Sequence, residues 1–180
     1  MTVRFAALAL AALSLAGADI PRTAPDFQVR MTDGKDILLS SYKGKVVAIE
    51  FILTDCGHCQ KASQTLNKLH RELGPQGFQP VAVAINNMAN MFVNDFVKQF
   101  NITYPVGFSP REPVLSFLQH DVMMSLMMPQ LVIIDRKGVV RYQYAGNDRF
   151  FEHEEKNLRE LLMPLIKTGA APPAKPAAKR

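Results

Sequence analysis

The sequence predicts an α/β sandwich, in which helices pack on a mixed β-sheet. Residues 45–53 and 78–85 are near-continuous apolar runs, which are typical of strands buried on both faces of a sheet. Each run is followed by a segment with helical periodicity, residues 57–73 and 91–100. This alternation, closed by a hairpin and a helix within residues 130–166, indicates layers packed around one core.

Shorter signals complete the predicted fold. Asp33-Gly34 is a tight-turn signal that predicts an N-terminal β-hairpin, and the turn sequence at residues 135–138 predicts a second hairpin. Leu158, Leu161, Leu162 and Leu165 share one face of the last helix. The predicted ranges are, in chain order, 27–31 and 37–39 for the first hairpin, 104–108 for a strand, 114–118 for a helix, 130–134 and 139–145 for the second hairpin, and 151–166 for the last helix.

The N-terminal residues resemble a targeting segment. Arg4 is followed by an apolar stretch at residues 5–15 and by the small residues Ala16-Gly17-Ala18. This pattern predicts a cleavable signal peptide over residues 1–18. The apolar stretch is shorter than the ~20 residues that a membrane helix needs. The alternative is an uncleaved N-terminal anchor. Cleavage would leave a periplasmic or secreted protein with no stable membrane insertion.

The C-terminal residues 169–180 are rich in Pro, Ala and Lys, and they predict a flexible tail. Residues 19–168 then form one domain, which is long enough to bury a core. The net charge of +5 arises largely from the two end segments, so the domain itself is nearly neutral. A nearly neutral domain argues against a nucleic-acid partner.

The only two cysteines stand two residues apart, in Cys56-Gly57-His58-Cys59. They follow a predicted strand and begin a predicted helix. Unpaired N–H groups at a helix N-terminus favour a thiolate, which is the nucleophilic form of cysteine. Cys59 lies one helical turn further on, where it can resolve a mixed disulfide. The spacing therefore predicts a redox-active pair, with Cys56 attacking and Cys59 resolving.

Two ionisable residues accompany this pair. Glu50 interrupts the apolar run of a predicted central strand, where a carboxylate is costly unless it is paired or protonated. Burial would raise its pKa and suit it to exchange a proton with Cys59; the alternative is a solvated Glu50 at a sheet edge. His58, as a cation, would favour the Cys56 thiolate and raise the reduction potential; the alternative is an exposed His that affects only solubility.

Four methionines lie within residues 123–128, just before Pro129. Methionine sulfur binds soft metals such as copper. More often, methionines serve as adaptable packing or as a pliable binding surface. His120, just upstream, is the nearby His that could complete a copper site.

Taken together, these segments resemble the thioredoxin-like superfamily, in particular its TlpA-like branch, which is related to the alkyl hydroperoxide reductase and thiol-specific antioxidant proteins. The resemblance covers residues 24–167. It rests on the Cys56–Cys59 motif and on Ala24-Pro25-Asp26-Phe27, Leu39 to Val47 (LSSYKGKVV), Tyr104-Pro105-Val106, Met128-Pro129 and Leu131 to Gly138 (LVIIDRKG). It implies a thioredoxin-like three-layer sandwich with an N-terminal β-hairpin and an inserted α/β unit.

The resemblance also implies roles for single residues. Cys56 and Cys59 match the redox pair, and Glu50 matches the buried acid below the resolving cysteine. Pro129 matches a cis-proline beside the pair, and Met128 precedes it and would contact the partner chain. No prosthetic group is implied. The implied partners are cysteine-containing proteins and an upstream thiol or disulfide donor.

Some features depart from that branch. The chain has no Trp, and Ile52-Leu53-Thr54-Asp55 replaces the usual aromatic stretch before the first cysteine. The Gly-His pair resembles the motif of protein disulfide isomerases. Reductase and oxidase or isomerase directions therefore both stay open.

Two other functions compete with disulfide exchange. A peroxiredoxin-type peroxidase needs a Pro and a Thr at set positions before its cysteine, but Thr54 stands two residues before Cys56 and no Pro precedes it in the strand. A Cu(I)-binding chaperone of the same fold would use the two thiolates and His120. Copper-delivery relatives, however, have three residues between their cysteines.

Overall fold

The centre of the fold is strand β4 (Val46–Ile52), all seven residues of which are buried. It pairs in parallel with β5 (Phe78–Ala84) and antiparallel with β7 (Gln130–Ile134). The computed structural model describes residues 19–168. The predicted signal peptide and tail, residues 1–18 and 169–180, lie outside the described residues.

One mixed sheet of eight strands runs through the described part, in the order β1-β8-β7-β4-β5-β6-β2-β3. Parallel pairing is confined to β4, β5 and β6, and the other pairs are antiparallel. The remaining strands are β1 (Arg22–Thr23), β2 (Gln28–Arg30), β3 (Asp36–Leu38), β6 (Val106–Phe108) and β8 (Val139–Ala145). The helices are α1 (Gly57–Leu73), α2 (Ala89–Phe100), α3 (Arg111–Leu118) and α4 (Glu154–Thr168), with short 3₁₀ turns η1 (Leu39–Tyr42), η2 (Gly74–Gln76) and η3 (Arg149–His153).

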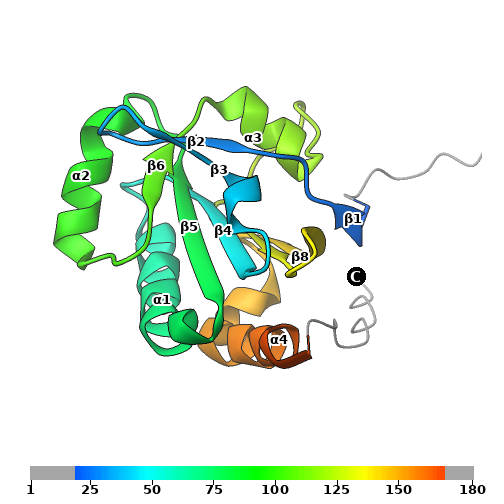
Figure 1. Ribbon diagram of the computed structural model, residues 1–180. Coiled ribbons are helices and arrows are strands. Elements are labelled where there is room, and N and C mark those ends of the chain that lie inside the picture. The colour runs from blue at the N-terminus through cyan, green and yellow to red at the C-terminus, as the bar shows by residue number, and fades with distance from the viewer. Residues whose placement is uncertain (1–18, 169–180) are drawn as a thin grey trace, which may run out of the picture.

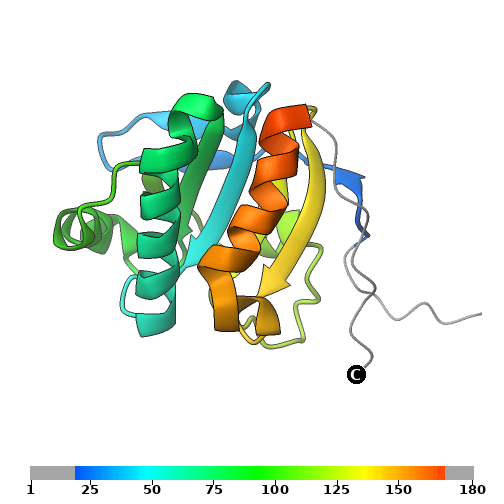
Figure 2. The same ribbon diagram turned by 90° about the horizontal axis from the view of Figure 1, so that it is seen from below.

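Helices cover both faces of this sheet, which gives three layers (Figure 1). Figure 2 shows α1 and α4 side by side on one face. Val46, Ala48 and Ile52 of β4 point to that face and pack with the apolar sides of α1 and α4. The alternate residues of β4 point to the other face, where α3 and the N-terminal segment cover them. Glu50 shares the parity of Ala48 and Ile52, so its side chain points toward α1 and α4.

The predicted α/β sandwich and both predicted hairpins are confirmed. β1 was not expected; its two residues pair with β8 at the edge of the sheet. The last helix was predicted as one segment from residue 151, whereas η3 precedes α4. On α4, Leu161 is only half-buried, while Leu158, Leu162 and Leu165 have no exposed surface. Within residues 19–168, none of the helices combines the length and the apolar character needed to cross a bilayer.

The topology brings the C-terminal end of β4 and the N-terminal end of β7 to the same edge of the sheet, the edge that strand ends form. β4 runs toward this edge and continues into Cys56, whereas β7 starts there, with Gln130 opposite Phe51. The Met128–Pro129 bond just before β7 is cis, as the family resemblance implied. Gly146 follows β8 and lies against this bond, and its N–H donates to the Met127 carbonyl at 3.1 Å. The cysteine motif and the cis-proline therefore lie at the same edge of the sheet.

Gly146→Ala is expected to destabilise the protein by about 2 kcal/mol or more, because the fold leaves no room for a side chain there. A Cβ on residue 146 would overlap the Met128 carbonyl group and lie 2.9 Å from the Pro129 nitrogen. Urea unfolding at constant pH measures the effect. Gly57→Ala is the matched control, since its Cβ would meet no atom within 4 Å. Equal stability of the two variants would contradict the prediction.

Candidate redox site

Cys56 is the N-cap residue of α1, the helix that begins where the loop after β4 ends. Its backbone is extended (φ −87°, ψ 114°), and its sulfur accepts the N–H of Cys59 at 3.3 Å. The sulfur thus occupies the place of the side-chain oxygen in an ordinary N-cap. Unpaired N–H groups and the helix dipole stabilise negative charge at this position. The geometry therefore suits Cys56 to carry the thiolate, and its side chain is partly exposed to a partner.

Cys59 differs from Cys56 in burial. It has no exposed surface, although the two residues lie in the same turn of α1. Burial raises the pKa of the Cys59 thiol above its usual range. The hydrogen bond with Cys56 and the charge of Glu50 act in the same direction. Cys59 is therefore a thiol at neutral pH and needs a base before it can attack.

Glu50 lies in the middle of β4 and is 1% exposed, so the alternative of a solvated carboxylate at a sheet edge is wrong. Its Oε1 accepts two hydrogen bonds, from the Ser63 hydroxyl at 2.6 Å and from the Tyr104 hydroxyl at 2.7 Å. Desolvation raises the pKa of Glu50 to about 8, and the two hydrogen bonds limit the rise. Near neutral pH, Glu50 can therefore both gain and lose a proton.

A second buried carboxyl, that of Glu154 in the first turn of α4, was not expected from the sequence. It is 5% exposed, and burial raises its pKa to about 7, while Lys61 and Thr65 of α1 lower it. Its charge also raises the pKa of Glu50. The sequence offered no local signal for this residue, because acidic side chains are common in the first turn of a helix.

His58 is half-buried at the start of α1. Its ring contacts the ring of Phe151 edge to face, with centroids 4.9 Å apart. The alternative of a freely exposed His is therefore wrong. Phe151 belongs to η3, directly before α4, so this contact joins the cysteine turn to the helix that carries Glu154.

The methionines before Pro129 are mostly exposed. Met123, Met124 and Met127 are 87%, 63% and 45% exposed, respectively, whereas Met128 is half-buried and packs against the core on both sides of the sheet. Of the two ordinary roles of methionine, a binding surface therefore fits this loop better than packing. His120 is held locally, with its Nδ1 2.8 Å from the Asp121 carbonyl oxygen.

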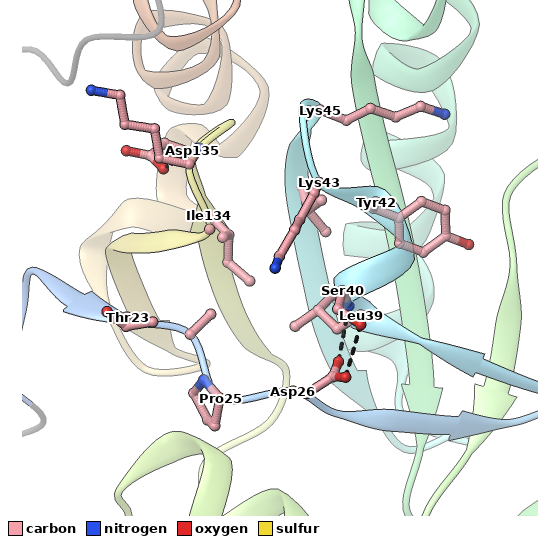
Figure 3. A pocket seen from close by; sticks show the side chains of 14 residues that line it. Thr23, Pro25, Asp26, Leu39, Ser40, Tyr42, Lys43, Lys45, Ile134 and Asp135 are labelled. Atoms are coloured by element: carbon pink, nitrogen blue, oxygen red, sulfur yellow. Dashed lines mark hydrogen bonds between the residues drawn. The ribbon is translucent and has the colours of Figure 1, made fainter.

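A cavity of about 430 Å³ lies away from the cysteine pair (Figure 3). Lys45, which precedes β4, and Asp135, which follows β7, mark its place at the opposite end of these two strands. On its wall, Asp26 accepts hydrogen bonds from the backbone and the hydroxyl of Ser40 (Figure 3). In the described part of the chain, no group of three or more His, Cys, Asp or Glu residues is placed to hold a metal ion.

The fold and the two thiols define a class: a thioredoxin-like thiol–disulfide oxidoreductase. The sequence model of the Redoxin family matches residues 21–162, and the chain belongs to this family.

Individual relatives agree with this class. The chain is 28% identical over 137 residues to the thiol-disulfide oxidoreductase ResA of Bacillus thuringiensis, with 76% of each chain covered. A Chlorobium tepidum structure assigned as a thiol:disulfide interchange protein DsbE superposes with a TM-score of 0.65 at 26% identity, covering 79% of this chain and 96% of that one. A Bacteroides thetaiotaomicron structure assigned as a protein disulfide isomerase gives 0.63 at 27% identity, with 81% and 91% covered.

Glu50→Gln is expected to remove a pH-dependent loss of stability. The pKa of Glu50 is raised on folding, so between about pH 5 and 8 the folded protein holds a proton that the unfolded chain has lost. Stability from this group is complete at the acidic end and falls by up to about 1.4 kcal/mol per pH unit as the pH rises toward 8. The advantage of Glu50→Gln over the unmodified protein should therefore grow with pH.

Urea unfolding at pH 5, 6.5 and 8 measures this difference. Glu152→Gln removes an exposed carboxylate and serves as the control, for which no such trend is expected. A constant difference between Glu50→Gln and the unmodified protein at all three pH values would contradict the prediction.

Proposed function

We propose that this protein is an exported thiol–disulfide oxidoreductase that exchanges disulfides with cysteines of other proteins through Cys56-Gly57-His58-Cys59. The observation that carries the proposal is the asymmetry of the two thiols: Cys56 is partly exposed at a helix N-terminus, and Cys59 is buried beside the ionisable Glu50. Export rests on the sequence pattern of residues 1–18 alone.

In the reducing direction, the Cys56 thiolate attacks one sulfur of a partner disulfide. A mixed disulfide forms, and the second partner sulfur leaves as a thiolate. Glu50, as a carboxylate, then takes the proton of Cys59. The Cys59 thiolate attacks the Cys56 sulfur, which forms the Cys56–Cys59 disulfide and releases the first partner sulfur as a thiolate. Two electrons pass to the partner, and the oxidising direction is the reverse of these steps.

The partner chain is proposed to lie over Met128 and Pro129. Both residues lie at the edge of the sheet where Cys56 follows β4, and Met128 is partly exposed there. The exposed methionines of residues 123–127 continue this surface. Unbranched, polarizable side chains adapt to different partner surfaces.

The geometry lends less support to the peroxidase alternative. In the peroxidase alternative a Thr hydroxyl would assist the cysteine, but the Thr54 hydroxyl donates to Asn86 Oδ1 at 3.4 Å. Peroxide consumption by the reduced protein is the test of that function. Anaerobic Cu(I) titration tests the chaperone function.

Replacement of either cysteine should separate the two steps of the reaction. Cys56→Ser is expected to lower the rate of insulin disulfide reduction by roughly a hundredfold or more, because it removes the nucleophile. Cys59→Ser keeps the nucleophile but not the resolving thiol, so a mixed disulfide with the partner should accumulate. Non-reducing electrophoresis and mass spectrometry detect that adduct. Full activity of Cys56→Ser would contradict the proposal.

His58→Phe tests whether His58 raises the reduction potential of the cysteine pair. In its cationic form, His58 would stabilise the Cys56 thiolate in the reduced protein. Phe keeps an aromatic ring against Phe151 but removes the charge. The reduction potential, measured against glutathione, is expected to fall by on the order of 30 mV. His153→Phe, at an exposed position, is the control. An unchanged potential in His58→Phe would exclude the tuning role.

A further inference from the structure

Glu154 is a buried ionisable group that the proposed exchange reaction does not use. It projects from the first turn of α4, next to the face of α1 that carries Lys61 and Thr65. α1 and α4 lie side by side over β4, the strand that carries Glu50 (Figure 2). Two carboxyls from different elements thus lie on the same face of the sheet and interact electrostatically.

The surroundings of the pair are otherwise poor in charge. Glu50 is influenced by Ser63, Tyr104 and Glu154, and it acts in turn on Cys59. The groups that influence Glu154 are Lys61 and Thr65, and its own charge acts on Glu50 and Tyr104. Lys61 is exposed, and it is the one cation of this set. Of the two carboxyls, Glu154 is therefore the one next to a charged group at the surface.

Each carboxyl also has one buried oxygen without a hydrogen-bond partner among the described residues. These atoms are Oε2 of Glu50 and Oε1 of Glu154. Buried polar atoms are rarely left unpaired, and those that remain unpaired are often involved in catalysis or hold water. Glu50 Oε1 already accepts two hydrogen bonds, so Oε2 is the oxygen on which a proton can be gained or lost.

We propose that Glu154 and Glu50 form a buried acid pair, in which Glu154 transfers protons between Glu50 and the solvent beside Lys61. The inference rests on the proposed role of Glu50 as the base for Cys59. In the reducing direction, Cys59 gives a proton to the Glu50 carboxylate, Glu50 passes it to the Glu154 carboxylate, and Glu154 releases it to water. One proton moves along the pair per turnover, and the oxidising direction reverses the path. Glu154 does not touch the reacting sulfurs, so it is a positioning and proton-transfer residue.

This arrangement has a measurable electrostatic consequence. The charge of Glu154 raises the pKa of Glu50. Removal of that charge should therefore let Glu50 ionise at a lower pH, by roughly half a unit to one unit. The step in which Cys59 resolves the mixed disulfide should also slow several-fold in Glu154→Gln, because its proton then reaches solvent less readily.

The test compares Glu154→Gln, Glu154→Asp and Glu155→Gln in the full protein. Side-chain carboxyl ¹³C NMR reports the pH at which Glu50 titrates, with Glu50→Gln used to assign its signal. Stopped-flow measurement of mixed-disulfide resolution from pH 5.5 to 9 reports the pH profile. Glu155→Gln removes the same charge from the same helical turn, but from a side chain that is paired with Lys68 and Arg159.

The expected result is a lower titration pH of Glu50 and slower resolution in Glu154→Gln, with the pH profile shifted in the same direction. Glu155→Gln should change neither quantity, and Glu154→Asp should restore the titration pH of Glu50 in large part. An unchanged Glu50 titration in Glu154→Gln, or an equal change in Glu155→Gln, would overturn the inference. The proposed function would survive that failure, since it depends on the Cys56→Ser and Cys59→Ser results.

Discussion

The Glu50 carboxyl is buried in the centre of an otherwise apolar strand. The arrangement of residues around the cysteine pair depends on this constraint. A charged carboxylate there would lose its hydration without gaining a cation, since no ion pair to Glu50 forms among residues 19–168. The Ser63 and Tyr104 hydroxyls offset part of this cost by donating to one oxygen. These two bonds also connect α1 and the segment before β6 to the central strand. Glu50, the proposed base for Cys59, is thus also held by the fold on two sides.

The same constraint makes the two cysteines unequal. Both belong to one helical turn, but only the Cys56 sulfur accepts an N–H group at the helix start and is partly exposed. Cys59 points into the core beside Glu50, where burial keeps it protonated. The Cys56 sulfur is therefore the one open to a partner, and the buried Cys59 is the one influenced by Glu50. The proposed order of the two chemical steps follows from this difference in burial.

The sequence predicted the parts of the site that leave a local signal. Glu50 stands out because it interrupts an apolar run, and the cysteine pair stands out by its spacing. Ser63 and Tyr104 lie 13 and 54 residues from Glu50, and nothing near them indicates that they donate to it. Glu154 lies among other acidic residues at a helix start, where carboxylates are ordinary. Its burial depends on how α4 packs against α1, which is a property of the tertiary structure.

Gly146 is a backbone feature that likewise leaves no local signal in the sequence. Its need for a bare Cα comes from the Met128–Pro129 bond, 17 residues earlier in the chain, which passes too close for any side chain. Such an approach arises only when β7 and β8 are paired. Strands and helices follow from periodic apolar patterns that a sequence displays directly. Contacts between elements that lie far apart in the chain depend instead on the packing that those patterns produce.

The surroundings of Glu50 and the methionine loop differ in physical character. Glu50, Ser63 and Tyr104 are buried and fixed by hydrogen bonds. Met123, Met124 and Met127 are exposed and carry flexible side chains, which would lose rotamer entropy if a partner covered them. The proposed proton exchange would thus depend on a rigid set of residues, and the proposed partner contact on an adaptable one. Under that proposal, changes in the methionine surface would alter which partners bind without disturbing Glu50 and its hydrogen bonds.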